Sequence, residues 1–275
     1  MRTHSLVRTL ATSLVVAVAA CLPAIAAAPP LQAGDSLTYE TTSQMKLSGN
    51  VPAQAAGRPQ PAYHATTTID VKSVNPDGSA VVHVVVKKDL PDGIHFGAAQ
   101  MAAWNQMNAG SEFDTTMMPW RALRINVDIE AFNGPALSGS AAQESAQMVA
   151  LGKDPNHQHA VAANEAKGYL STVDAVAEAC AKRASFAPGD TWHAIIDGLP
   201  YDFAVTGRQT EGARDVVVLS VAYDWVNPGG ETKLNGTALY DPKAQLVVGT
   251  HTATIASIKA NGMTSTTTSD TTLKE

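Results

Sequence analysis

The sequence predicts a mainly β protein with a helical insert, an α+β fold. We expect a long curved antiparallel sheet, or half-barrel, with the helices packed on one of its faces. Between Gly189 and Leu273, apolar and polar residues alternate in long runs joined by turn sequences. Thr and Val are abundant and aromatic residues make up only 5% of the chain, which suits strands better than a helical bundle. Only Ser138–Ala187 has the Ala- and Gln-rich character of helices.

Residues 1–26 have the pattern of a secretory signal peptide. Arg2 and Arg8 form a basic start without acids, an apolar run covers Leu10–Ala20, and the small residues of an A-x-A cleavage site follow at 24–26. We therefore expect an exported protein, periplasmic or secreted.

An alternative processing site lies inside the same segment. Val18-Ala19-Ala20-Cys21 resembles a bacterial lipobox, which would leave Cys21 lipidated and make the protein an outer-membrane lipoprotein. We favour cleavage near Ala26, with Cys21 as one more small residue of the apolar run.

The mature chain is acidic and has no candidate membrane span. Removal of Arg2 and Arg8 leaves 17 basic against 25 acidic residues, a net charge of −8, which does not suit nucleic acid. No later apolar stretch approaches the length of a spanning helix. We expect a single mature β-rich domain at 27–275, divided into an N-terminal β part (27–137), a helical insert (138–187) and a C-terminal β meander (188–275).

The N-terminal β part contains several predicted strands. Ser36–Leu47 alternates strictly, which indicates one covered face and one solvated face. His64–Val74 and Ser79–Lys88 form a hairpin across an Asn-Pro-Asp-Gly turn, and Arg121–Ala131 is the clearest single strand. Gly97–Asn108 is predicted as a short helix.

The insert is predicted to hold three helices, at Ser140–Leu151, Gln158–Lys167 and Ser171–Arg183. In the last of these, Ser171 is the predicted N-cap. One face of that helix is apolar and is the predicted wall of a ligand pocket: Val173, Val176, Ala177 and Cys180.

The C-terminal part is predicted as an antiparallel meander. Its strands are Asp215–Val226, Lys233–Tyr240, Gln245–Lys259 and Met263–Leu273, with an Asn-Gly hairpin turn before the last. Gly249 is a candidate bulge. Gly34-Asp35 and Gly189-Asp190 each open a β run, which suggests a duplicated β unit; an ordinary turn before a strand explains the same pattern.

Catalytic and cofactor motifs are absent from the sequence. It contains no G-x-S-x-G elbow, no H-E-x-x-H and no Gly-rich phosphate loop, and we expect no cofactor. His157 and His159 are the best metal candidates, but they lie in what we interpret as a solvated interhelical loop without further close ligands. Cys180 fits a small buried apolar residue better than a nucleophile. Asp197 and Asp202 flank a turn, and turn formation explains them.

The order of the elements resembles that of exported lipoprotein carriers and lipoproteins of the LolA, LolB and LppX type. The shared features are a signal peptide, a long strand opened by Gly34-Asp35, a helical insert at Ser138–Arg183 and a long final meander. Pro188-Gly189-Asp190-Thr191-Trp192 is similar to a run found in uncharacterised exported bacterial β proteins. The carrier resemblance implies a curved half-barrel whose apolar concave face is covered by helices.

Three functional classes follow from these observations. The favoured one is a non-catalytic cell-envelope protein that binds or carries an apolar ligand, a lipid or a lipidated protein, between sheet and helices. The alternatives are an exported hydrolase or metal-dependent enzyme whose site forms only in the fold, and a structural or surface-interaction protein.

Processing is testable directly. We expect mass spectrometry of the protein from an exporting host to find a free amino group near Ala27, because the A-x-A site ends at Ala26. A diacylglyceryl group on Cys21 would establish the lipoprotein alternative, and retention of Met1 would contradict both.

Overall fold

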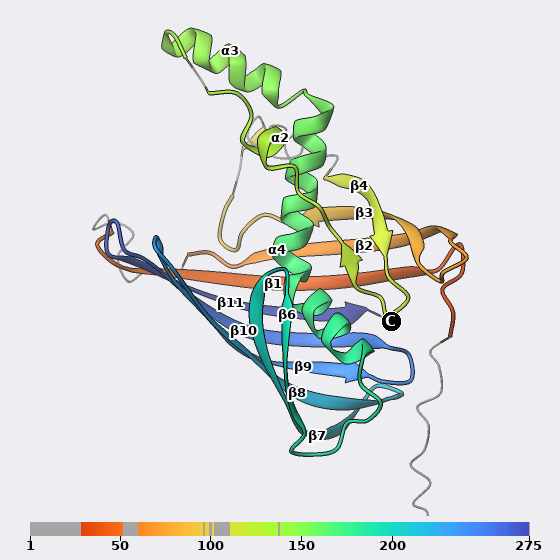
Figure 1. The fold of residues 1–275 in the computed structure, drawn as a ribbon. Helices are drawn as coiled ribbons and strands as arrows, with labels where there is room; N and C mark the ends of the chain where they lie inside the picture. The colour runs from red at the N-terminus through yellow and green to blue at the C-terminus, as the bar shows by residue number, and fades with distance from the viewer. Residues whose placement is uncertain are drawn as a thin grey trace, which may run out of the picture.

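One antiparallel sheet of eleven strands forms the body of the protein (Figure 1). The computed structural model describes residues 29–51, 60–95, 97–98, 101, 111–136 and 138–274. The strand order is β5-β4-β3-β2-β1-β11-β10-β9-β8-β7-β6, so β5 and β6 are the edges of an open sheet. The strands are β1 (Ser36–Gly49), β2 (Tyr63–Val74), β3 (Ala80–Lys88), β4 (Glu112–Met117), β5 (Leu123–Arg124), β6 (Thr191–Ile196), β7 (Leu199–Glu211), β8 (Arg214–Asn227), β9 (Gly230–Asp241), β10 (Leu246–Ile258) and β11 (Met263–Lys274).

The first and last strands pair at the middle of the sheet. β1 and β11 are antiparallel in unbroken register from Thr38↔Lys274 to Gly49↔Met263. This pairing joins the N-terminal and C-terminal β parts, which the helical insert separates in the sequence. The other neighbouring strands are consecutive in the sequence, and the predicted hairpins at β2–β3 and from β8 to β11 are confirmed. The predicted bulge is confirmed as well, because the β9–β10 register shifts between Val247 and Gly249.

The insert folds into helices on one face of the sheet, as predicted, but their boundaries differ. Its helices in the described ranges are α3 (Ala141–Leu151) and α4 (Pro155–Ala181), and the short helix α2 (Ile129–Asn133) precedes the insert. α4 replaces the two helices predicted at 158–167 and 171–183, and Ser171 lies in its interior rather than at an N-cap. It begins at Asp154, whose side chain accepts a hydrogen bond from Asn156 N, followed by Pro155 in the first turn. Gly168 does not interrupt it.

The strand predicted at Arg121–Ala131 is wrong. Only Leu123 and Arg124 pair with β4, and Asp128 then caps α2 by accepting a hydrogen bond from Ala131 N. The alternation is still visible in burial: Leu123 is buried, and Ile125 and Val127 pack partly against the core. An alternating pattern therefore identified one covered side of this segment, but the segment leaves the sheet after Arg124 and does not pair with the first four residues of β4.

The two Gly-Asp turns have the same local structure. Gly34 N donates to Val71 O and Val71 N donates to Asp35 O, while Gly189 N donates to Val205 O and Val205 N to Asp190 O, all at 2.8–2.9 Å. Both glycines have φ near +90°, which disfavours any side chain. The strand register shifts just after Val71 and just after Val205. These matching details support the repeated β unit suggested by the sequence.

The core lies between α4 and the concave face of the sheet. α4 contacts strands from both halves, including β3, β4, β6, β9 and β10, and crosses them in Figure 1. Its buried residues are mostly Ala, with Leu170 and Val176 as larger side chains at 1% and 0% exposure. The strands contribute mainly Val, Leu and aromatic residues.

The continuity of α4 predicts the outcome of a paired glycine substitution. Gly168→Ala should raise the free energy of unfolding by up to about 1 kcal/mol, because Gly168 is exposed, helical and free of atoms within 4 Å of an added Cβ. Gly189→Ala should lower it by about 1 kcal/mol or more, because Gly189 has φ +89°. Urea unfolding measures both changes. Destabilisation by Gly168→Ala would show a helix break at this residue.

Candidate functional site

Along the long strands, the side chains on the concave face change from buried at one end to exposed at the other. On β8, alternate residues face α4: Val217, Leu219 and Val221 are at most 1% exposed, Tyr223 is half-buried, and Trp225 is 39% exposed. β1 shows the same gradient, from buried Tyr39 to Met45 at 39%. The alternation predicted from the sequence places these rows correctly. α4 covers one end of the face, and the other end projects past it (Figure 1).

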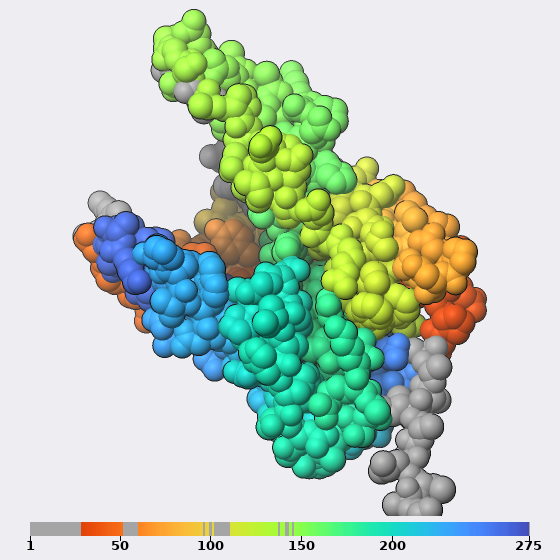
Figure 2. Space-filling view, in the orientation of Figure 1, coloured from red at the N-terminus to blue at the C-terminus, as the bar shows by residue number. Residues whose placement is uncertain are grey.

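The projecting end exposes apolar side chains from four strands. Cross-strand register puts Met45 of β1, Tyr63 of β2, Trp225 of β8 and Ile258 of β10 on the concave side, each 39–43% exposed. Thr and Ser side chains lie between them on β10 and β11. Figure 2 shows a hollow between the helices and these strand ends. We call this surface the open end of the concave face.

The predicted ligand-pocket residues lie away from the open end. Val173, Val176, Ala177 and Cys180 are 3%, 0%, 1% and 2% exposed and belong to the continuous core under α4. Burial also raises the pKa of the Cys180 thiol, so a reactive thiolate is disfavoured. These four side chains are therefore packed against the strands and leave no room for a ligand between them and the sheet.

An aromatic series lines the concave face near the β6 edge. Trp192 stacks on Phe203 at 5.2 Å between ring centroids, Phe203 on Tyr201 at 5.9 Å, and Tyr201 meets Tyr223 edge-on at 5.0 Å. These contacts stabilise the strands. The four rings form a continuous surface from the core toward Trp225, which we call the aromatic wall. The sequence did not predict this wall, because its rings come from three strands that only the sheet brings side by side.

A pocket of about 310 Å³ lies at this wall, between α4, β5 with the segment after it, and the β6–β7 hairpin. Tyr201, Leu199 and Trp225 form its apolar side. α4 contributes Lys167, Ser171, Asp174, Ala175 and Glu178, whose spacing places them on one helix face. The hairpin turn presents Asp197, which has φ +51° beside Gly198, so both turn residues are left-handed as in a type I′ turn.

Two ion pairs connect α4 to the other walls of the pocket. Lys167 Nζ lies 2.8 Å from Asp197 Oδ2, and Arg124 Nη1 lies 2.8 Å from Glu178 Oε2. Lys167 and Glu178 are eleven residues apart on α4, about 16 Å at the helical rise of 1.5 Å. Asp174 lies between them, and its Oδ1 accepts a hydrogen bond from Leu123 N at 2.8 Å.

Burial raises the pKa of the Asp174 carboxyl to about 8. The hydrogen bond from Leu123 N and the charges of Arg124 and Lys167 lower the pKa, and the charge of Asp197 raises it, but desolvation is the largest effect. The carboxyl is therefore poised to change charge near neutral pH. Sequence reasoning missed this residue, because an Asp near a predicted helix start has an ordinary explanation.

The structure does not bring the two candidate histidine ligands together. His157 and His159 lie in the first turns of α4, where residues two apart point in different directions. His157 Nδ1 is 2.8 Å from Ala131 O, and the His159 ring meets Phe113 edge-on. The predicted loop is thus wrong, and within the described ranges no group of three or more His, Cys, Asp or Glu residues is placed to hold a metal ion.

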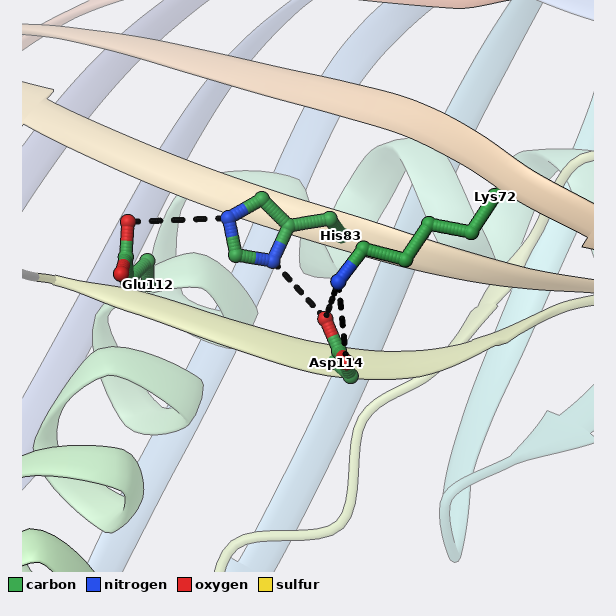
Figure 3. Close-up of polar contacts among 4 residues, drawn as sticks. All are labelled: Lys72, His83, Glu112 and Asp114. Atoms are coloured by element: carbon green, nitrogen blue, oxygen red, sulfur yellow. Dashed lines mark hydrogen bonds and ion pairs between the residues drawn. The ribbon is translucent and has the colours of Figure 1, made fainter. Parts of the chain in front are cut away.

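Histidine–carboxylate pairs bridge neighbouring strands on the convex face. In Figure 3, His83 of β3 lies between Asp114 and Glu112 of β4, with Nδ1–Oδ1 at 2.8 Å and Nε2–Oε2 at 3.6 Å, and Lys72 also binds Asp114. The hydrogen bonds from Lys72 and His83 lower the pKa of Asp114. His193 pairs with Asp202 and His251 with Asp270 in the same way. These contacts fit cross-strand pairing.

One hydroxyl–imidazole–carboxylate series also lies on the convex face. Thr42 Oγ1 is 3.1 Å from His64 Nδ1, and His64 Nε2 is 3.3 Å from Asp92 Oδ1. Both contacts are solvent-exposed, and the hydroxyl belongs to a strand residue whose backbone is held in the sheet. The series resembles the other exposed histidine–carboxylate pairs and lacks the enclosed setting in which such groups act as nucleophile and base.

In comparisons with known proteins, no family model matches the chain and no curated protein matches it. None of the helices in the described ranges has the length and apolar character needed to cross a membrane.

The raised pKa of Asp174 predicts a pH-dependent stability difference. A carboxyl that titrates near 4 when unfolded and about 8 when folded makes folding less favourable as pH rises from about 4 to about 8. Asp174→Asn keeps an acceptor for Leu123 N and removes that charge. We expect its free energy of unfolding at pH 9 to exceed that of wild type by roughly 1–3 kcal/mol. This is less than the full pKa shift would give, because the residue is only half-buried.

Denaturant unfolding at several pH values measures this difference, which should shrink toward zero near pH 4. Asp89→Asn is the control, because it makes the same charge change at an exposed residue. A difference that is constant with pH would contradict the raised pKa.

Proposed function

We propose that this protein is a non-catalytic, exported binding or carrier protein of the cell envelope that holds an apolar ligand on the concave face of its sheet. The ligand class is a lipid or the acyl part of a lipidated protein. The observation that carries the proposal is the open end, where Met45, Tyr63, Trp225 and Ile258 expose apolar surface on the inner side of a curved sheet. Exposed apolar surface gathered in a concavity is typical of ligand sites.

The arrangement of the covering helix supports the same function. α4 closes one end of the concave face with a packed core, so the sheet stays stable while the other end remains accessible. An acyl chain entering the open end would meet apolar and hydroxyl side chains and would end at the aromatic wall. The LolA-type order of elements and the predicted signal peptide, both expectations from the sequence, are the grounds for proposing a carrier and its export.

A matched pair of substitutions on β10 tests the proposal. Ile258 and Ile255 are both 41% exposed, but they lie on the concave and the convex face respectively. Ile258→Asp should weaken binding of a dansyl-labelled undecanoic acid about tenfold, because a loss of about 1.4 kcal/mol is expected when apolar contact is replaced by a charge. Ile255→Asp should leave the affinity unchanged. Fluorescence titration measures both.

Two results would contradict the proposal. One is equal weakening by Ile255→Asp and Ile258→Asp, which would place the probe on no particular face. The other is the absence of saturable binding by the wild type.

A further inference from the structure

The pocket beside α4 contains the Asp174 carboxyl, which forms no ion pair with a described residue. Arg124 and Lys167 pair with Glu178 and Asp197, and Asp174 accepts a hydrogen bond from Leu123 N. That bond uses one carboxyl oxygen. Three acids and two bases line the pocket, so its charge is negative whenever Asp174 is ionised.

The rest of the pocket is suited to an apolar body. Trp225, Tyr201 and Leu199 form one side, and Ala175 of α4 offers no bulk on the other. The volume of about 310 Å³ lies at the lower end of the range for small-molecule sites. Aromatic faces also attract organic cations, most strongly where water is excluded.

We propose that this pocket binds a small organic cation, an ammonium group on an apolar or aromatic body, with Asp174 as its counter-ion and Tyr201 and Trp225 as its aromatic wall. The bound ammonium replaces the water that an ionised Asp174 would otherwise need. Ser171 is exposed and lines the pocket one helical turn before Asp174. This site does not depend on an acyl chain in the open end of the concave face.

Other ligand classes fit the pocket less well. An anion would face Asp174, Glu178 and Asp197, of which the last two are already engaged by the available bases. A neutral apolar molecule would leave the carboxyl with the single contact to Leu123 N. A metal ion would need further ligands that converge on one point, which the described residues do not provide.

Isothermal titration with 2-phenylethylammonium at pH 6, 7, 8 and 9 tests the proposal. Binding of the cation requires ionised Asp174, so the affinity should rise up to tenfold per pH unit toward pH 8 and then level off. The probe remains protonated over this range, since alkyl ammonium groups titrate near 10. 2-Phenylethanol and 3-phenylpropionate have similar size and should bind at least tenfold more weakly at pH 8.

Variants separate the pocket from non-specific binding. Asp174→Asn should weaken 2-phenylethylammonium at least tenfold at pH 9 and remove the pH dependence, while Asp89→Asn should retain both. Ser171→Trp fills the pocket from its exposed rim and should also abolish binding, whereas Asn164→Trp, two turns earlier on α4 and exposed, should not. Urea unfolding confirms that each variant is folded.

The proposal is overturned by any of three results. These are no saturable binding by the wild type at millimolar probe, equal affinity for 2-phenylethanol, or unchanged affinity in folded Asp174→Asn. Because the probe carries no acyl chain and the fatty-acid titration uses no ammonium, failure of this site and failure of the carrier function are distinguishable.

Discussion

The pairing of β1 with β11 is the interaction on which the rest of the structure depends. It joins two β parts that lie at opposite ends of the chain, and side-chain hydrogen bonds fix its register. Thr41 Oγ1 and Thr271 Oγ1 are 3.0 Å apart and both residues are buried, and Ser43 Oγ and Ser269 Oγ are also 3.0 Å apart. A slip by one residue would separate these hydroxyls and would turn every inward side chain outward. The Thr- and Ser-rich sequence of β11 thus acts as a register signal at the centre of the concave face.

A sheet joined in this way needs a cover that reaches both halves, and α4 provides it. Seven of its twelve buried residues are Ala, which lets the helix approach the strands closely without large side chains of its own. Where α4 crosses the sheet, the helix fills the concavity. The remaining depth lies at the open end and in the pocket beside the β6–β7 hairpin. The position of α4 therefore decides which part of the concave face is packed as core and which part remains open to a ligand.

Local chemistry made much of this fold predictable. Asn-Gly at 261–262 and the Asn-Pro-Gly-Gly turn at 227–230 specified hairpins through their own backbone preferences, and alternation specified which residues of β8 face inward. The pairing of β1 with β11 was not predicted, because no turn connects the two strands. The single helix α4 was missed because Ser171 looked like an N-cap, although packing on both sides of it maintains the helix. Asp174 was missed for a different reason: its chemistry comes from Leu123, Arg124 and Asp197, which only the tertiary structure brings near it.

The character of Asp174 becomes clearer beside the other acids that bind backbone amides. Asp128 and Asp154 cap helices at exposed sites, where the hydrogen bond to the backbone adds stability. Asp174 makes the same kind of bond to Leu123 N, but at a place where burial opposes its charge. An Asn could accept that hydrogen bond without any pH-dependent loss of stability. A structural role for Asp174 thus explains why the residue accepts a hydrogen bond, but not why it is an ionisable acid. A cationic ligand in the adjoining pocket would use that carboxylate charge.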